Sequence, residues 1–197
     1  MPTPTTRAAR ATETGISRRA AAVLLATVAL AGCGSSSHTP FGWLRPAAQP
    51  AGWFLLRIPS GAAIAYPAAW QRLHGDPGSG TVALRNASGH FLGYLNLTPR
   101  QGEEQLATWA SFRVDHNREE GDRQVVELGH AGGLRFRNAR GSCVSDRYVT
   151  QVGTSYHEIA CLVVGARAAT VVVAAAPPGS WARVAPALQR AISTLTT

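Results

Sequence analysis

The chain has 197 residues, which is enough for one domain with a hydrophobic core and too short for two ordinary domains. All nineteen basic residues are arginine, and four of them, with one of the eleven acidic residues, precede residue 20. The rest of the chain therefore carries a formal charge of +5, a mildly basic surface that does not predict binding to nucleic acid.

The N-terminal segment has the order of a secretory signal. Residues 1–19 hold the four arginines, and the next thirteen residues, "AAAVLLATVALAG", are small or apolar. As a helix they span roughly 20 Å, short of the ~30 Å hydrocarbon core of a bilayer. We therefore expect residues 1–32 to be a signal peptide rather than a permanent membrane-spanning helix.

The sequence "LAGC", residues 30–33, closes this segment and resembles the lipobox of bacterial lipoproteins. The resemblance implies cleavage before Cys33 and acylation of its thiol with fatty acids such as palmitate. A conventionally cleaved or uncleaved signal remains an alternative, as does export by either the general or, from "SRRAAAV", the twin-arginine route. We expect the chain to be anchored by lipid at the extracytoplasmic face of the cell membrane, with residues 33–50 as lipidated cysteine and flexible tether.

Residues 51–197 predict a single domain of short strands and two helices. A hairpin or two extended segments come first, and a second hairpin follows them. An amphipathic helix over 103–120 comes next, with Gly121 past its end and with Leu106, Trp109, Ala110 and Val114 on one side. Five closely spaced strand-like segments then predict an antiparallel meander. A second helix closes the chain, with Ser180 as its expected N-cap. The strand-like segments are "QVVELGH", "GLRFRNAR", "CVSDRYVTQV", "YHEIACLVV" and "AATVVVAAA".

This order predicts an α+β fold in which a central and a C-terminal helix flank an antiparallel sheet. Together with "YPAAW" (66–70), "GHAGGLRF" (129–136) and "APPGSW" (176–181), it resembles the PsbP-like fold, which many small actinobacterial lipoproteins share. The resemblance implies an accessory or assembly role in the cell envelope. It implies no catalytic motif, and it transfers no functional residue to this chain.

We expect Cys143 and Cys161 to form a disulfide, because a pair of cysteines in an exported protein usually does. A three-residue loop over 151–153, with Gly153 left-handed, places the two cysteines opposite each other. The same register opposes Asp146 and Glu158, which predicts a bulge or a shifted register with a diagonal disulfide. Free thiols, or a metal site that uses both sulfurs and His157, remain alternatives.

The search for chemistry yields weak candidates. His116 and Glu120, four residues apart at a helix end, and His74 with Asp76 in a glycine-rich loop offer acid–base groups. Arg135 and Arg137 point outward from one strand and form a possible contact for anions. Four aromatic residues could line an apolar ligand pocket, although a core position is their default: Tyr66, Trp70, Trp109 and Trp181.

The common hydrolase, phosphate-binding and dinucleotide-binding motifs do not occur in this sequence. We therefore expect a non-enzymatic envelope protein without cofactor or metal, which binds a protein, a wall polymer or a lipid near the membrane. A carrier of an apolar ligand is the first alternative, and a small envelope hydrolase is the second.

Overall fold

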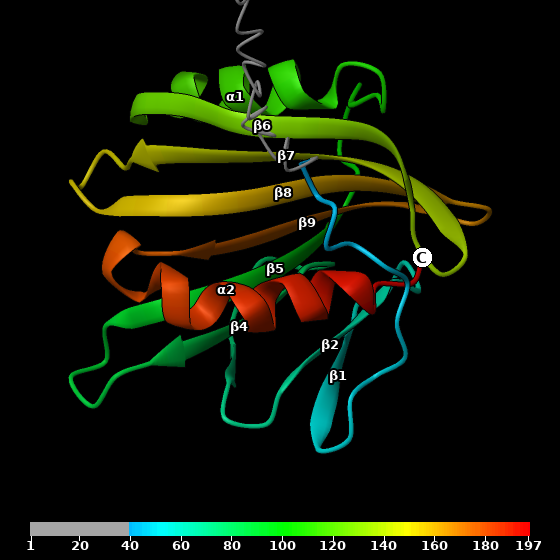
Figure 1. Cartoon of the computed structure of the whole chain (residues 1–197), viewed down its shortest axis with the longest axis horizontal. Helices are drawn as coiled ribbons and strands as arrows, with labels where there is room; N and C mark the ends of the chain where they lie inside the picture. Colours follow the sequence, from blue (N-terminus) through cyan, green and yellow to red (C-terminus); the bar gives the residue numbers. More distant parts are fainter. Residues whose placement is uncertain (1–39) are drawn as a thin grey trace, which may run out of the picture. The chain divides into compact units, whose positions relative to one another are not determined.

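Nine strands and two helices follow one another in the computed structural model, which describes residues 40–197 (Figure 1). The signal peptide predicted over residues 1–32 and the lipidation site Cys33 lie outside the described residues. Neither described helix is long and apolar enough to span a membrane. The elements are β1 (Trp53–Arg57), β2 (Ala63–Pro67), β3 (Gln71–Leu73), β4 (Gly80–Arg85), β5 (Phe91–Pro99), α1 (Trp109–Glu119), β6 (Arg123–Arg135), β7 (Ala139–Val149), β8 (Ser155–Gly165), β9 (Ala169–Ala176) and α2 (Pro178–Ser193).

Seven of the strands form one antiparallel sheet in the order β3-β4-β5-β9-β8-β7-β6, and β1 and β2 form a separate hairpin. The predicted α+β class is confirmed, and so are the hairpin alternative for the first two segments, β1–β2, and the second predicted hairpin, β4–β5. β9 lies at the centre of the sheet because its sequence, "ATVVVAAA", is apolar on both faces, and all but its first residue are buried.

The meander contains four strands, not the five predicted. The segment "GLRFRNAR" is not a strand of its own, because a turn closed by the Phe136 N–H and the Ala139 carbonyl interrupts it. Its first half belongs to β6 and its last two residues begin β7. The sequence pattern does not reveal this turn, because Leu134 and Phe136 alternate with polar residues as they would in a strand. In the structure, Phe136 lies in the turn and its side chain is buried in the core.

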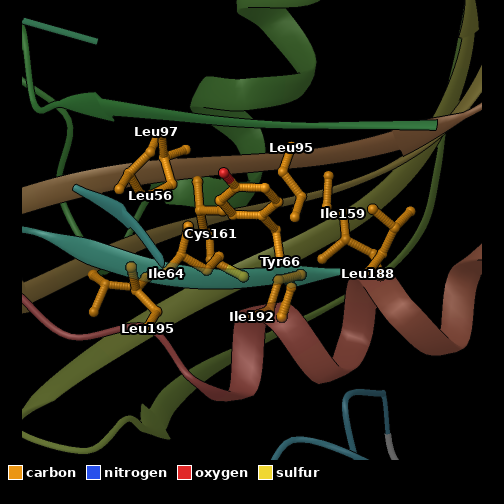
Figure 2. Close-up of a cluster of buried hydrophobic side chains, with 14 of the residues drawn as sticks. Leu56, Ile64, Tyr66, Leu95, Leu97, Ile159, Cys161, Leu188, Ile192 and Leu195 are labelled. Atoms are coloured by element: carbon orange, nitrogen blue, oxygen red, sulfur yellow. The ribbon is translucent and has the colours of Figure 1, made fainter. Parts of the chain in front are cut away.

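One face of the sheet is covered by α2 and the β1–β2 hairpin. Figure 2 shows their apolar side chains interdigitated with those of β5 and β8, with Tyr66 in the middle. The helix can lie this close to β5 because residue 93 is glycine: a Cβ there would stand 2.6 Å from Val184. Val184, Leu188 and Ile192 recur at helical spacing along α2, and all three are buried on this side.

Helix α2 begins three residues before its predicted start. Pro177 is the N-cap, and Pro178 takes the first helical position, where its missing N–H leaves no partner unsatisfied. The predicted cap Ser180 lies inside the helix and donates its hydroxyl to the Leu92 carbonyl, 2.6 Å away. This serine therefore joins the helix to β5 instead of capping it.

Helix α1 packs on the opposite face, against β6, β7 and β8. It begins at Trp109 rather than Glu103, because residues 101–104 form a turn held by Glu104, whose carboxylate accepts the Gly102 N–H at 2.7 Å. Its end agrees with the prediction: Gly121 follows with a φ of 85° and donates to the Arg118 carbonyl.

The folded domain begins before residue 51, which is where the sequence predicts its start. Phe41 and Leu44 are 7% and 5% exposed and belong to the core beneath α2, and the Ala47 N–H donates to the Ser193 carbonyl. Residues 40–50 thus form part of the folded unit instead of a flexible tether, because their aromatic and aliphatic side chains have an apolar surface to cover. The remainder of the predicted tether, residues 33–39, lies outside the described residues.

Candidate ligand cleft beside helix α1

A cleft of about 550 Å³ lies beside α1, where the helix leaves part of the sheet uncovered. α1 has only eleven residues and packs mainly on β6, β7 and β8, so it covers β5 and β9 less completely on this face. Side chains of these two strands form the floor of the cleft, and the loops before β4 and after β5 form its rim. The floor residues are Tyr94, Asn96, Thr98, Val171 and Val173.

Three rings of α1 form a continuous stack along the wall of the cleft. The Phe112 ring lies between those of Trp109 and His116, with centroids 5.9 and 5.8 Å away. Trp109 is 2% exposed and anchors the stack by donating its indole N–H to the Ala160 carbonyl at 3.0 Å, whereas Phe112 is 37% exposed. The stack therefore has a fixed inner end and an outer end open to a ligand.

Carboxylates surround the mouth of this cleft. Four of the ten acidic residues in 40–197 line it, although the range 40–197 as a whole carries a formal charge of +5. Burial acts to raise the pKa of Glu104, but hydrogen bonds from the Gly102 and Gln101 N–H groups outweigh it and hold the pKa below its ordinary value. The cleft is thus rich in hydrogen-bond acceptors. The four are Asp76, Glu103, Glu104 and Glu120.

Both acid–base candidates from the sequence reach this cleft. Asp76 of the glycine-rich loop lines it together with His116 and Glu120, whose Nε2 and Oε1 are 3.3 Å apart. His74, the other candidate in that loop, does not line it. The sequence could not predict this meeting, because the loop and the helix are forty residues apart.

A buried polar cluster fixes α1 to the sheet below the cleft. The Arg113 Nε and Nη2 donate to the two carboxylate oxygens of Glu158 at 2.7 and 2.9 Å, and the Tyr148 hydroxyl donates to the same carboxylate at 3.0 Å. Glu158 is completely buried, and the ion pair raises the pKa of Arg113 despite the opposing effect of burial. The wall of the cleft is therefore held by a bidentate pair.

Asp146 is the second buried carboxyl of this cluster, and no cationic side chain within residues 40–197 forms an ion pair with it. Burial, followed by the charge of Glu158, raises the pKa of Asp146 to about 8. Its Oδ2 accepts the Asn117 side-chain N–H at 3.3 Å, while its Oδ1 and the Asn117 Oδ1 have no partner within residues 40–197. Burial and the neighbouring charge of Glu158 therefore both favour the protonated form of Asp146.

Tyr94 connects the floor of the cleft to this cluster. Its hydroxyl lies 3.5 Å from that of Tyr148, which in turn donates to Glu158. Burial, and then the charge of Glu158, raises the pKa of Tyr94. The floor residue is therefore a neutral hydroxyl that is held in place from below.

The strand pair that carries the cluster also carries the disulfide. Cys143 and Cys161 are opposite each other in the β7–β8 register and are joined, and both are completely buried. Gly153 is left-handed, and the Thr150 N–H donates to the Thr154 carbonyl, as the three-residue loop predicts. The described residues contain no group of three metal-ligating side chains, and the His157 ring instead packs edge-on against Trp181.

The four aromatic residues predicted to line one pocket are divided between the two faces of the sheet. Tyr66 and Trp70 belong to the core between the sheet and α2, and Trp181 packs against that core. Trp109 lies on the opposite face of the sheet. Only Trp109 reaches the cleft, because the alternating sides of the strands separate the two helices by the thickness of the sheet.

Arg135 and Arg137, the predicted pair for anions, are both exposed but separate from each other. Arg137 lies in the β6–β7 turn and lines a second cleft together with Arg57 of β1, whereas Arg135 remains in β6 and lines neither cleft. The intervening turn at Phe136 changes the direction of the chain between them.

Solved structures with this fold exist, whereas no protein-family model and no curated protein matches the chain. CyanoP, the PsbP of the cyanobacterium Synechocystis, matches with a TM-score of 0.53 and 14% identity, over 75% of this chain and 94% of that chain. LpqN of Mycobacterium tuberculosis, described as involved in cell envelope biogenesis, matches at 0.39 and 15%, over 76% and 81%. A Pseudomonas aeruginosa protein of unknown function matches at 0.44 and 13%, over 74% and 96%.

The likeness to CyanoP confirms the predicted PsbP-like fold. At 14% identity it extends to the fold alone, and the other two likenesses are looser still. The class of this chain is therefore a PsbP-like α+β domain with a ligand-sized cleft beside its first helix.

Proposed function

We propose that this protein is a non-catalytic, lipid-anchored binding protein of the bacterial cell envelope, and that its α1 cleft takes a hydroxyl-rich segment of wall glycan. The cleft carries the proposal, because it combines an aromatic stack with several carboxylates in a volume suited to a few sugar rings.

The anchor is supported by the order of the N-terminal segments in the sequence. Basic residues, an apolar run and "LAGC" precede the folded unit, which begins no later than Pro40. A lipid on Cys33 would leave only six residues, 34–39, between the membrane and the described unit. A ligand close to the outer surface of the membrane, such as wall glycan, is within reach of such a protein.

The chemistry of the lining favours a ligand that donates hydrogen bonds. Ionised carboxylates accept hydrogen bonds and cannot donate them, so a ligand that contacts Glu103 and Glu120 has to present hydroxyl or ammonium groups to them. Sugar rings supply hydroxyl donors along their edges and apolar C–H groups on their faces, which suit the exposed outer part of Phe112. A saccharide thus matches both the carboxylates and the aromatic surface of the lining.

Binding without catalysis is supported by how the charged groups are held. Arg113 is bound by Glu158, and Glu104 by backbone N–H groups. The side chains of His116 and Glu120 are 41% and 58% exposed, and general acid–base groups are usually tuned by burial that these two do not have. The cleft is built to hold a ligand in place.

Calorimetric titration of the purified full chain with the tetrasaccharide of N-acetylglucosamine tests this proposal. We expect binding that weakens about tenfold in Glu120→Gln, because one hydrogen bond to a charged group is lost, and comparably in Phe112→Ala. Matched controls are Glu127→Gln and Phe54→Ala, which change exposed residues outside the cleft. These controls should bind like the unaltered chain.

Two results would contradict the proposal. One is the absence of tetrasaccharide binding by the unaltered chain. The other is tight binding of a tetra-arginine peptide, together with no response to the sugar, which would assign the acidic cleft to a basic protein segment.

A further inference from the structure

A second cleft of about 550 Å³ lies where the β1–β2 hairpin, the β6–β7 turn and the residues after α2 meet. Figure 1 shows these three segments at the end of the unit that carries the C label. Hydrogen bonds hold them together. Ala63 and Thr196 exchange backbone hydrogen bonds. The Asn138 carboxamide donates to the Thr197 carbonyl and accepts the Thr197 N–H. The walls of this cleft are therefore fixed by the fold.

Two arginines converge on this cleft from segments eighty residues apart. Arg57 ends β1, and Arg137 lies in the β6–β7 turn. The turn is anchored by Phe136, which is 5% exposed and packs so closely on residue 141 that a Cβ there would stand 2.4 Å from its ring. Backbone that is held by the fold thus places both arginines in the lining of one cavity.

Neither guanidinium forms an ion pair with any residue in 40–197, and no Asp or Glu side chain lines the cleft. The rest of the polar lining is neutral: two threonine side chains and two carboxamides, Thr194, Thr196, Gln49 and Asn138. The free donors of this lining are therefore the two arginines, and no Asp or Glu side chain lies beside them in the cleft. This lining is opposite in character to the acidic cleft beside α1.

We propose that this cleft binds a phosphate ester, with Arg57 and Arg137 holding the phosphate and the rest of the cavity taking a small polar remainder such as glycerol. A guanidinium presents a planar fork of N–H donors that matches two phosphate oxygens, so two of them can bind one phosphate from two sides. A cavity of this volume has room for a phosphate and a small polyol.

This phosphate ester has two sources in a cell envelope. It is either the headgroup of a membrane phospholipid or a soluble phosphate ester. The cleft lies on the part of the unit built from the hairpin and the C-terminal residues, away from the α1 cleft, so both clefts can be filled at once. The assignment does not depend on the proposed glycan ligand.

Titration of the full chain with glycerol 3-phosphate tests the assignment, with glycerol and sodium chloride as reference solutes. We expect saturable binding that weakens at least tenfold in Arg57→Gln and in Arg137→Gln, because each change removes charge-assisted hydrogen bonds. The matched control is Arg135→Gln, two residues away and outside the cleft, with Arg72→Gln as a second. All four side chains are exposed, so the variants should fold, and circular dichroism checks this.

Flotation with vesicles distinguishes the two sources. The full chain carrying Cys33→Ala is mixed with phosphatidylglycerol or phosphatidylcholine vesicles, each variant being compared with its control of equal charge. A loss of flotation specific to Arg57→Gln and Arg137→Gln identifies a lipid headgroup, whereas glycerol 3-phosphate binding without this loss identifies a soluble ester. Equal binding of both ligands by the cleft and control variants, or no binding of either ligand, would overturn the assignment.

Discussion

Asp146 lies directly opposite Glu158 in the β7–β8 pair, and both carboxyl groups are completely buried. Like charges in such a pair are unfavourable, which is why the sequence predicts a bulge or a shifted register. The structure keeps the register and resolves the conflict with partners from α1. Arg113 neutralises Glu158, and Asn117 hydrogen-bonds to Asp146.

A proton on Asp146 completes this arrangement. The acid then has a hydrogen to donate, and within residues 40–197 the Asn117 Oδ1 is a buried acceptor without a partner. The raised pKa of Asp146, about 8, agrees with this proton. With this proton, the two opposed carboxyl groups carry one negative charge instead of two, and Arg113 balances that charge.

The first prediction concerns stability against pH. The unfolded chain releases the Asp146 proton near pH ~4 and the folded chain near pH 8, so between these values the folded chain binds more protons. The contribution of this group to the free energy of unfolding is fully present below about pH 4. It falls as pH rises toward 8, by up to ~1.4 kcal/mol per pH unit.

Urea denaturation of the unaltered chain and of Asp146→Asn, at intervals from pH 5 to 9, measures this contribution. The amide is a neutral mimic of the protonated acid, so the variant should lack this part of the pH dependence. Its stability relative to the unaltered chain should rise with pH up to about 8. If the free energies of unfolding of the two proteins change with pH in parallel, Asp146 is ionised in the folded protein.

A second prediction concerns the buried ion pair. Glu158→Gln leaves the Arg113 charge without its carboxylate in a buried site, and we expect a loss of about 3–5 kcal/mol in the free energy of unfolding. Asp115→Asn is the control, because it breaks the exposed pair with Arg118 on the same helix and should cost at most about 1 kcal/mol. Chemical denaturation at pH 7 compares them, and similar losses for the two variants would argue against a special role for the buried pair.

A third prediction concerns the disulfide. Cys143 and Cys161 are completely buried, so neither should react with an alkylating reagent before reduction, and both should react after reduction in denaturant. The double variant Cys143→Ala/Cys161→Ala should lose about 3 kcal/mol of stability by the chain-entropy argument. Mass spectrometry counts the alkylated thiols, and two modified cysteines in this pair without reductant would refute the pairing.

A fourth prediction concerns the anchor. Cys33→Ala should abolish the incorporation of a fatty-acid analogue into the chain in growing cells, because the lipobox resemblance assigns the acylated thiol to this residue. Cys143→Ala/Cys161→Ala serves as the control and should be labelled normally. Undiminished labelling of the Cys33 variant would show that the anchor has been misassigned.

Part of this architecture follows from local sequence alone. The three-residue turn at 151–153 fixes the β7–β8 register and thereby places the cysteines opposite each other, and this can be counted on paper. The hairpins and the buried face of α2 follow in the same way from apolar periodicity. Local signals suffice here because neighbouring segments pair with each other.

The candidate site could not be derived in this way. Arg113 and Asn117 lie on α1, forty-five and twenty-nine residues from their partners, and no local pattern specifies such contacts. A signal was nevertheless present: they follow Trp109 at intervals of four, on the face that helix packing buries. Two opposed carboxylates in a predicted register also required a donor from elsewhere. Where the helix stops covering the sheet, and so where the cleft opens, depends on tertiary packing.

The central claim is that the α1 cleft is the ligand site of this protein. A photo-crosslinking amino acid placed at Phe112 in the full chain, in intact cells, tests it most directly, with the same substitution at Phe54 as the reference. Phe54 is the more exposed of the two, at 55% against 37%, so non-specific labelling would favour it. The account predicts a wall-saccharide adduct at position 112 and none at position 54, and equal labelling at the two positions, or no saccharide at position 112, would contradict it.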